Sequence, residues 1–367
     1  MGWINANGIW IGRNRGGGLG SSYWTPSSAV VQQAAPADIV LTYAKKVNPA
    51  DAVTTNFTVA GKTISGAVLD GTGKILTLTV TVAFVYGDSI TVVANGINIA
   101  VTNNISAEAE LTTYITGLAT PLSLSTRKKL NDYLKLIKAD LGGVADLDDV
   151  KDVDIILAGE TAESSLKNIA KNAHHATAVN SPAFTAFEGF TGDGISSYVE
   201  VDYVPSSGTT YQLNSAHYGL YFRVFARGNN KYHGVYSTTA DGGVSNSLVI
   251  GCANLEGTSL STAINSAQVA LANNSTSGYF IIRRLSNTGY NVFINKSSNT
   301  VLEDSTKRPN QKLVVLGRRT NDGTVGLLNT SQIAHITLGK GLSDTEVEKQ
   351  TDDFEAYMDS NSKGLIA

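Results

Sequence analysis

The 367-residue chain has few cysteines, few charged residues and no long apolar run, and each of these absences excludes a common class of protein. Its single cysteine, Cys252, excludes an intrachain disulfide and a zinc site built from cysteines. Charged residues make up only 16% of the chain, and the net charge is -3. Such a balance argues against a protein that works by neutralising phosphates, so we expect no nucleic acid partner.

Long apolar runs are also missing. No stretch approaches the roughly eighteen uninterrupted apolar residues that a membrane helix needs, so no membrane partner is expected. The start, "MGWINANGIWIGRNRGGG", has neither the basic beginning nor the apolar core of a secretion signal. We also find no residue pattern that calls for a metal or another cofactor, and we predict none.

The composition is typical of short strands joined by tight turns. Glycine is abundant, proline is scarce, and Thr, Ser, Asn and Val recur throughout. The length exceeds that of an ordinary single domain, which indicates two or three domains, each with its own core. The sequence therefore predicts a mainly β protein.

Residues 1–36 hold all three tryptophans of the chain together with a basic pair. So short a segment cannot build a core, yet tryptophan and arginine are the residues that dominate protein interfaces. We interpret 1–36 as a docking peptide; the alternative is a disordered leader. The predicted docking residues are Trp3, Trp10, Arg13, Arg15 and Trp24.

Residues 37–104 alternate strongly between apolar and polar. In "ILTLTVTVAF", which covers 75–84, the residues Leu76, Leu78, Val80, Val82 and Phe84 fall on one face, as in a half-buried antiparallel strand. A second strand is expected at "SITVVA". The region resembles bacterial immunoglobulin-like modules, a resemblance that implies a spacer domain.

Between 105 and 183 the period becomes helical, and we predict a helical connector. In "STRKKLNDYLKLIKADLGG" an apolar stripe runs along one face, and similar patterns predict further helices near 147–157 and 162–173. These stripes are narrow and need partners within or between chains. The predicted oligomer contacts are Leu130, Leu134, Ile137 and Leu141.

From 184 to 367 short strands return at regular intervals, as expected for a two-sheet sandwich of jelly-roll type. A final helix begins at Ser343, which is a good N-cap, and Glu346 occupies the capping-box position three residues later. The apolar residues Val347, Phe354 and Met358 are expected to lay this helix on the sandwich.

Two stretches, "GFTGDGISSYVEVDY" and "IAHITLGKGLSDTEVEKQTDDFEAYM", resemble the first and last elements of concanavalin A-like lectin/glucanase domains of phage structural proteins. The middle stretch "ILAGETAESSLKNIAKNAHHATAVN" joined to such a domain is similar to phage virion appendage proteins. The resemblance implies a structural virion protein, a head fibre or a tail-associated fibre. It further implies a homotrimer, partners among the capsid or tail proteins, and an outer domain that binds cell-surface or mucin-like glycan.

Glucan-cleaving members of this fold carry Glu-x-Asp-x-x-Glu on one strand, and "EVDYVP" comes close with Glu200 and Asp202. Residues two apart in a strand share a face, at a separation near that used by glycosidases. Pro205 stands where the second glutamate belongs, so we predict binding without cleavage and no enzyme. The alternatives are a carbohydrate-active hydrolase of the same fold and a bacterial surface adhesin.

Three further groups were weighed against simpler explanations. His174 and His175 are adjacent, so they point in different directions and suit a solvated connector better than a metal site. Asp-Gly turns offer oxygen ligands for calcium but are explained by turn formation. The tyrosines of the last domain can serve a glycan platform or the core. They include Tyr198, Tyr203, Tyr211, Tyr218, Tyr221, Tyr232, Tyr236, Tyr279 and Tyr290.

Overall fold

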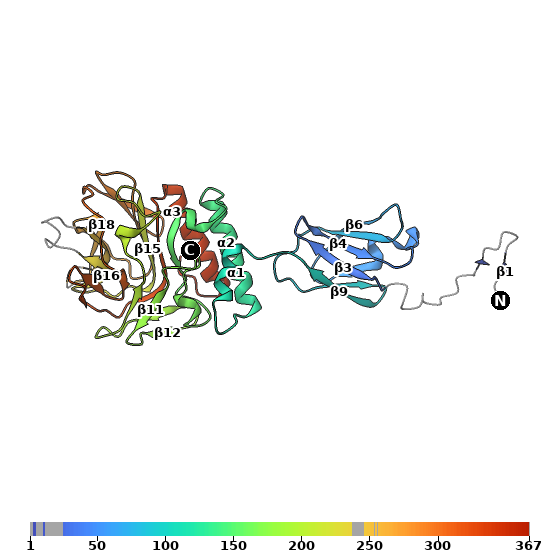
Figure 1. The fold of residues 1–367 in the computed structure, drawn as a ribbon, viewed down its shortest axis with the longest axis horizontal. Coiled ribbons are helices and arrows are strands. Elements are labelled where there is room, and N and C mark those ends of the chain that lie inside the picture. Colours follow the sequence, from blue (N-terminus) through green and yellow to red (C-terminus); the bar gives the residue numbers. More distant parts are fainter. Residues whose placement is uncertain are drawn as a thin grey trace. The chain divides into compact units, whose positions relative to one another are not determined.

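The computed structural model describes residues 3–4, 10–11, 25–236, 246–252, 254 and 256–366. These form two compact units, 1–107 and 108–367 (Figure 1). Two short strands at the start, β1 (Trp3–Ile4) and β2 (Trp10–Ile11), pair antiparallel. Arg13, Arg15 and Trp24 lie outside the described residues, as do the side chains of Trp3 and Trp10. The docking prediction therefore stays a prediction.

Unit 1 is a small β-sandwich, as the immunoglobulin-like resemblance implied. Its seven strands follow the order β5-β8-β9-β3-β4-β7-β6, with β3 and β9 parallel. In chain order they are β3 (Ser28–Gln32), β4 (Ala35–Thr42), β5 (Phe57–Val59), β6 (Ile64–Leu69), β7 (Ile75–Val80), β8 (Ile90–Ala94) and β9 (Ile97–Asn103). The first of these strands already lies within the residues 1–36 that we assigned to a docking peptide.

The strand predicted at 75–84 is confirmed as far as Val80, where β7 ends. Leu76, Leu78 and Val80 are buried as predicted, and they form the core together with Phe84. Val82 is 63% exposed, because the chain leaves the sheet before it and the alternation no longer applies. The strand expected at "SITVVA" is β8.

Unit 2 is the predicted two-sheet sandwich closed by a C-terminal helix. The large sheet has the order β12-β13-β26-β15-β20-β21-β22, with β10 also paired to β26; the second has β19-β18-β17-β16-β24-β25, and a small sheet has β11-β14-β23. The strands of the large sheet are β10 (Lys151–Ile155), β12 (Ala183–Thr185), β13 (Gly189–Thr191), β15 (Ala216–Val224), β20 (Gly278–Arg284), β21 (Tyr290–Ile294), β22 (Ser297–Val301) and β26 (Gln332–Gly339).

The other two sheets pack across the core from the large one. The second sheet is built from β16 (Lys231–Tyr236), β17 (Ser247–Cys252), β18 (Ser259–Ser266), β19 (Val269–Ala272), β24 (Arg318–Thr320) and β25 (Val325–Gly326). The small sheet is built from β11 (Ala176–Val179), β14 (Tyr198–Val201) and β23 (Val314–Val315). Residues from all three sheets meet in one apolar cluster, which includes Leu220, Ile250 and Val199.

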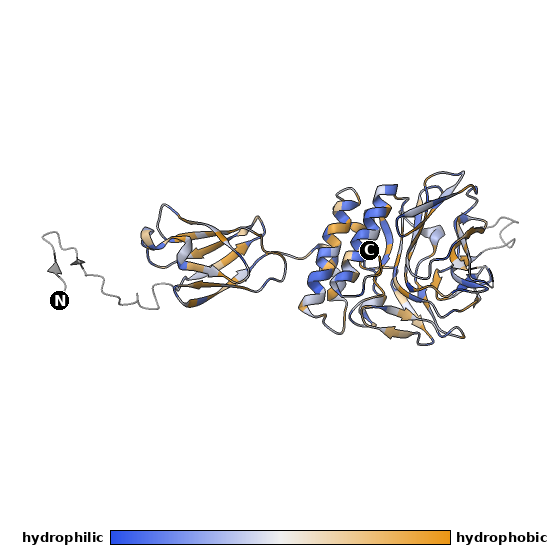
Figure 2. Ribbon diagram, turned by 180° about the vertical axis from the view of Figure 1, so that it is seen from behind, coloured by the Kyte–Doolittle hydropathy of each residue, from blue (hydrophilic) through white to orange (hydrophobic). Residues whose placement is uncertain are grey.

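Three helices cover the outer face of the large sheet: α1 (Ala109–Thr116), α2 (Leu124–Asp140) and α3 (Asp344–Ser360) (Figure 1). The capping box of α3 is present as predicted, with Ser343 and Glu346 bonded reciprocally. Figure 2 shows apolar and polar residues alternating along these helices, as expected for elements with one buried side. Val347, Phe354 and Met358 are fully buried, and the Phe354 ring stacks on His335 of the sheet with centroids 4.2 Å apart.

The stripe on α2 finds its partner inside the chain. Leu130, Leu134, Ile137 and Leu141 are at most 2% exposed, and α2 packs against α3. The contacts that we expected within or between chains are thus seen within the chain. The predicted oligomer itself stays a prediction.

The helices predicted near 147–157 and 162–173 are not formed. Lys151–Ile155 is the strand β10, and the later stretch holds turns and one short 3-10 helix, Ser164–Leu166. Spacings of three fit Val150, Val153 and Ile156 to a helix face, but pairing with β26 places this segment at the sheet. Residues 108–183 are thus part of the same compact unit as the sandwich.

A polar cluster lies fully buried between the large sheet and the helices. Lys151 Nζ is 2.7 Å from Asp154 Oδ2, and His335 Nε2 contacts the other oxygen of that carboxylate. Tyr133 of α2 donates to Asp154, while Tyr279 bonds to His335 Nδ1 at 2.7 Å. Burial opposes ionisation of Asp154, but the charges of Lys151 and His335 outweigh it and hold its pKa well below the usual range.

Asp353 on α3 differs from Asp154, because its pKa is raised and not lowered. Burial and the neighbouring Asp140 carboxylate raise its pKa to about 7, against smaller opposing effects of Lys151 and Lys349. The folded state therefore binds a proton that the unfolded chain has released, and stability should fall as the pH rises from about 4 to about 7. At about 1.4 kcal/mol per pKa unit, the cost is at most about 4 kcal/mol.

We expect Asp353→Asn to flatten this dependence. Urea unfolding at pH 5 and pH 8 measures it, with the exposed neighbour Asp352→Asn as the matched control. The control should behave as the wild type does. Equal slopes with pH in both variants would contradict the assignment to Asp353.

Candidate functional site

The two carboxylates predicted from "EVDYVP" do share one face of a strand. Glu200 lies on β14 opposite Thr177 of β11, while its neighbours Val199 and Val201 point into the core. Asp202 follows directly after the strand, and its side chain is 70% exposed. Period two of the strand thus brings both acids to the outer surface of the small sheet.

Both acids are paired with cations that come from more than 100 residues further along. Lys312 Nζ lies 2.8 Å from Asp202 Oδ1 and 3.8 Å from Glu200 Oε1, and Arg319 contacts Glu200 Oε2. The hydrogen bond from Lys312 and its charge lower the pKa of Asp202. Asp202 and Lys312 therefore present an ionised carboxylate and an ammonium group side by side at neutral pH.

The adjacent histidines also reach this site and are not in a solvated connector. His174, with φ of +57°, directs Nδ1 to the Asp202 carbonyl oxygen at 2.8 Å, which makes Nδ1 the donor. His175 Nδ1 instead accepts from the backbone N–H of Asn168 at 3.1 Å. Burial and the neighbouring Lys167 and His174 lower the pKa of His175. The two rings point in different directions, as predicted.

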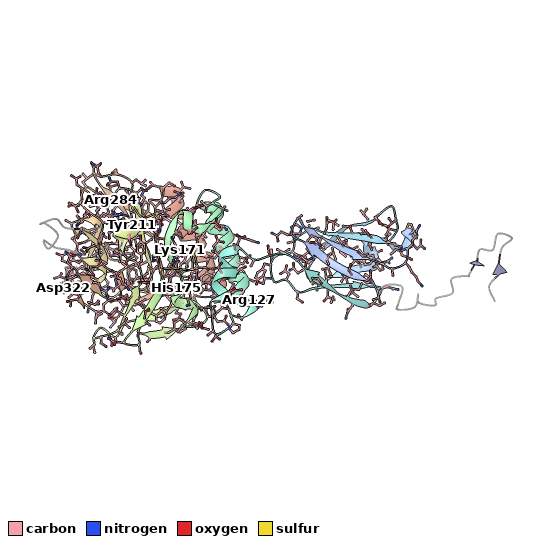
Figure 3. The ribbon with its side chains drawn as sticks, in the orientation of Figure 1. Arg127, Lys171, His175, Tyr211, Arg284 and Asp322 are labelled. Carbon is pink, nitrogen blue, oxygen red and sulfur yellow. The ribbon has the colours of Figure 1, made fainter. Side chains whose placement is uncertain are left out.

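Two hollows meet at His175. The first is a shallow depression of about 560 Å³ between β11, β14 and the segment before β23, lined by His174, His175, Thr177, Glu200, Asp202 and Lys312. The second is a narrower hollow of about 330 Å³ between α1 and residues 167–175. Figure 3 shows Lys171 and His175, which both line it, on neighbouring parts of the chain. Its other side carries apolar groups from Ala109 and Ile169.

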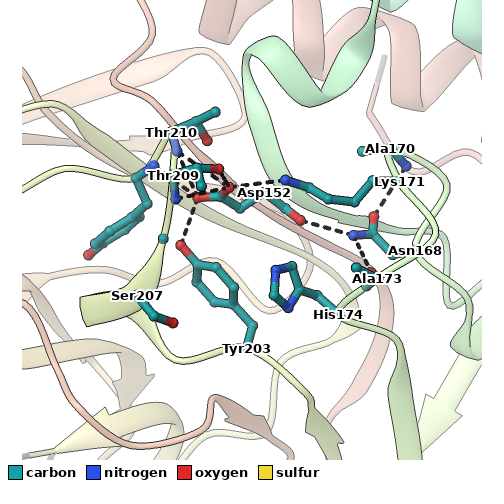
Figure 4. Close-up of polar contacts among 12 residues, drawn as sticks. Asp152, Asn168, Ala170, Lys171, Ala173, His174, Tyr203, Ser207, Thr209 and Thr210 are labelled. Atoms are coloured by element: carbon teal, nitrogen blue, oxygen red, sulfur yellow. Dashed lines mark hydrogen bonds and ion pairs between the residues drawn. The ribbon is translucent and has the colours of Figure 1, made fainter.

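The carboxylate of Asp152 is the centre of a hydrogen-bond network, which we call the floor and which includes Lys171 and Asn168 of the narrower hollow (Figure 4). It accepts hydrogen bonds from Thr209 Oγ1 at 2.6 Å, Tyr203 Oη at 2.9 Å and the backbone N–H of Tyr211 at 2.9 Å, and pairs with Lys171. Burial opposes ionisation of Asp152, but these bonds outweigh it and hold its pKa well below the usual range. A single buried group therefore joins β10 to residues 203–211 and to Lys171, which lines the narrower hollow.

Asn168 completes this floor through all of its polar atoms. Its Nδ2 donates to the carbonyl oxygens of Asp152 and Ala173, each at 2.9 Å, and its Oδ1 accepts from the N–H groups of Asp154 and Ala170. The segment that carries His174 is thus tied to the large sheet. Such fixed geometry lowers the entropy lost when a ligand binds.

The tyrosines proposed for a glycan platform mostly serve the core. Of the nine, only Tyr198 and Tyr236 are partly exposed. Four of the buried ones lie on the large sheet, which is covered on both faces, so alternation leaves no face open there: Tyr218, Tyr221, Tyr279 and Tyr290. The buried ones are Tyr203, Tyr211, Tyr218, Tyr221, Tyr232, Tyr279 and Tyr290. A broad aromatic platform built from these residues is therefore wrong.

Metal ligands do not gather in the part of the chain that the structure describes: it contains no group of three or more His, Cys, Asp and Glu that could hold an ion. Asp193 and Asp322 cap their turns, accepting from the backbone N–H groups of Ile195 and Thr324 respectively. Asp241 lies outside the described residues. No helix within the described ranges is long and apolar enough to span a membrane.

Lys312, Arg319, Asp152 and Asn168 were not identified from the sequence. Lys312, Arg319 and Asp152 bond to residues far away in the chain, so no local spacing marks them, and Asn168 lies in a segment that had been assigned to a helix. Asp152 and Asp154 alternate with apolar residues in "KDVDI", directly before Ile156 and Leu157, and acids so placed are a signal of buried, bonded carboxylates. That signal was available, but the segment had been assigned to a helix.

No protein-family model matches the sequence, and no curated protein is found as a relative. Solved structures that resemble the chain include a mutant Trypanosoma rangeli sialidase displaying trans-sialidase activity, at 10% identity and a TM-score of 0.41, over 65% of this chain and 39% of that one. The binding domain of Paraclostridial Mosquitocidal Protein 1 matches at 10% identity and a TM-score of 0.39, over 57% and 53%. The chain thus spans about two fifths to one half of these proteins.

These comparisons contradict our prediction that the chain is not an enzyme, because sialidases stand among the matches. The missing third acid of "EVDYVP" rules out only one arrangement of catalytic carboxylates, on one strand. The likeness is too remote to assign an activity in its place.

Proposed function

We propose that unit 2 binds glycan at the shallow depression and the narrower hollow beside it. The observation that carries the proposal is the gathering of ionised Asp202 and Lys312 with Glu200, His174 and Thr177 in one open, polar depression. Sugar hydroxyls both donate and accept hydrogen bonds, so neighbouring carboxylate and ammonium groups match a pair of them. Bonds to charged groups are about twice as strong as neutral ones.

The narrower hollow suits the less polar side of a sugar ring. Its volume of about 330 Å³ is at the lower end of small-molecule sites, and it combines apolar groups with Asn172, Lys171 and His175 at one rim. A sugar seated there extends into the depression past His175, which lines both. The fixed floor built on Asp152 and Asn168 favours binding without rearrangement.

The test is a glycan array probed with the full chain and with Lys312→Ala. We expect the variant to bind about tenfold more weakly, since losing a charge-assisted hydrogen bond costs about 1.5–3 kcal/mol. Lys349→Ala is the matched control, because its side chain is 49% exposed against 44% for Lys312 and is likewise paired with an aspartate. Unchanged binding of the Lys312 variant would contradict the proposed site.

An assay for released reducing ends should accompany the array. Release that depends on Asp202 would extend the proposal from binding to cleavage at the same site. Release unaffected by Asp202→Asn would place catalysis elsewhere in the chain.

We further propose that the chain is a phage appendage, a head fibre or tail-associated fibre, in which residues 1–24 dock to the virion and the lectin-like unit faces outward. The support is the sequence resemblance and the order of a tryptophan-rich segment, a small sandwich and a larger one. Many copies on one particle would multiply weak single-site affinities, as in a homotrimer or larger array.

Deleting residues 1–24 tests the docking part of this proposal. The cut must stop there, because β3 begins at Ser28 and belongs to the sheet of unit 1. A folded truncated chain should be absent from purified particles that contain the full chain. Normal incorporation would contradict docking through this segment, and light scattering of the isolated protein would test the trimer.

A further inference from the structure

The second sheet carries an arginine whose charge no described residue balances. The side chain of Arg318 on β24 makes no hydrogen bond or ion pair with any residue in the described ranges, and its Nε is buried without a partner. The arginines around it differ: Arg319 contacts Glu200, Arg308 donates to backbone carbonyls, and Arg227 donates to three of them. An unpaired, half-buried cation needs an explanation.

Two tyrosines hold this guanidinium in place. Its carbon lies 4.1 Å from the centroid of the Tyr236 ring and 4.7 Å from that of Tyr232. The register of β16 and β24 explains the arrangement, since Arg318 pairs with Gly234, which lies midway between the tyrosines. Residues two apart in a strand share a face, so the guanidinium has a ring on either side and no side chain beneath it.

Glycine is required at two positions near the guanidinium and the two tyrosines, Gly234 and Gly251. Gly234 has φ of +134°, and a Cβ there would lie 1.9 Å from the Leu248 carbonyl oxygen. Gly251 pairs with Tyr232, and a Cβ on it would lie 2.4 Å from that ring. The tyrosine ring and the guanidinium are therefore set by the backbone of the sheet, which fixes the direction of the arginine fork.

The surroundings favour an anion from outside the chain. Burial lowers the pKa of Arg318, and the only opposing groups among described residues are Tyr232 and Tyr236, with no carboxylate. Tyr232 itself packs in a cluster with Val249 and Ala263, which are fully buried and apolar. A planar fork in a partly dry setting pairs with carboxylates through two parallel hydrogen bonds.

We propose that Arg318, held between Tyr232 and Tyr236, binds the carboxylate of an acidic sugar. This site is separate from the depression at Lys312, but its ligand class rests on the proposed glycan-binding function. The alternative is that Arg318 only covers the apolar patch of Val249 and Ala263, in which case it would respond to no ligand.

The test follows the side-chain Nε–Hε NMR signal of Arg318 in the full chain during titration. The signal is assigned by its disappearance in Arg318→Lys. Glucuronate should shift it saturably in the millimolar range, while glucose, which lacks the carboxylate, should not. Acetate should need at least a threefold higher concentration than glucuronate.

Several outcomes would overturn the proposal. No shift with glucuronate at tens of millimolar would mean that Arg318 only packs, and this result needs no variant that might misfold. Equal responses to glucose would remove the role of the carboxylate, and equal responses to acetate would remove the sugar. Lys296→Gln, which removes an exposed charge elsewhere, should leave the titration unchanged.

A failure of the Arg318 proposal can be told apart from a failure of the proposed glycan site at Lys312. Lys312→Ala should abolish or weaken array binding without altering the Arg318 titration. Tyr236→Leu keeps the charge but removes one ring, so it should weaken the glucuronate response severalfold while leaving array signals that depend on Lys312 intact.

Discussion

Lys151→Met should destabilise unit 2 by about 3–5 kcal/mol, because it leaves the Asp154 carboxylate buried with its main counter-charge removed. Both side chains are fully buried, so no water can replace the lost ammonium. The remaining side-chain contacts of the carboxylate are Tyr133 and His335, and the pKa of His335 is lowered by burial, against the opposing influence of Asp154. Urea unfolding followed by near-ultraviolet circular dichroism measures the effect, since unit 2 holds most of the tyrosines.

A double replacement shows whether stability is lost because the ion pair is gone or because Asp154 is left buried without its counter-charge. Lys151→Met combined with Asp154→Leu removes both charges, and much of the lost stability should return, because an apolar pair of similar volume can replace a buried ion pair. Lys349→Met is the surface control and should change stability by no more than about 0.5 kcal/mol. A double variant that is less stable than the single one would show that Tyr133 and His335 depend on Asp154 more than Asp154 depends on Lys151.

Asp152→Ala is the second large change that we expect, at about 3–5 kcal/mol, because it leaves the donors of Thr209, Tyr203 and Tyr211 without their shared acceptor. The loss should be local as well as global. Amide hydrogen exchange at residues 209–211 should speed up, since all three of these N–H groups bond directly to the carboxylate.

Two variants bracket this result. Asp152→Asn keeps one acceptor and should retain part of the stability. Asp202→Ala removes an exposed, singly paired carboxylate directly after β14 and should cost less than about 1 kcal/mol. If Asp152→Ala weakens glycan binding and speeds up exchange at 209–211, while Asp202→Ala leaves that exchange unchanged, then Asp152 positions the site and does not itself contact the glycan. Unchanged exchange at 209–211 in Asp152→Ala would contradict the role of Asp152 as the anchor of the floor.

Short-range signals in the sequence were sufficient to predict a helix or strand where the segment has one buried face or is capped by its own residues. The alternation of Leu76, Leu78 and Val80 identified β7, and the pair Ser343 and Glu346 identified the start of α3. The physical reason is that strand period and helix capping depend on residues two to four apart. The mainly β fold with a closing helix followed from the same patterns.

Tertiary structure alone decided the rest, because the deciding partners lie far away in the chain. Pairing with β26 made Lys151–Ile155 a strand although its spacing also fits a helix, and packing on α3 gave the α2 stripe a partner in the same chain. The site shows the same division: period two placed Glu200 and Asp202 on one face, but only the fold brought Lys312 to them. Sequence spacing fixes which way a side chain points, whereas the energy of a charge depends on what the fold places beside it.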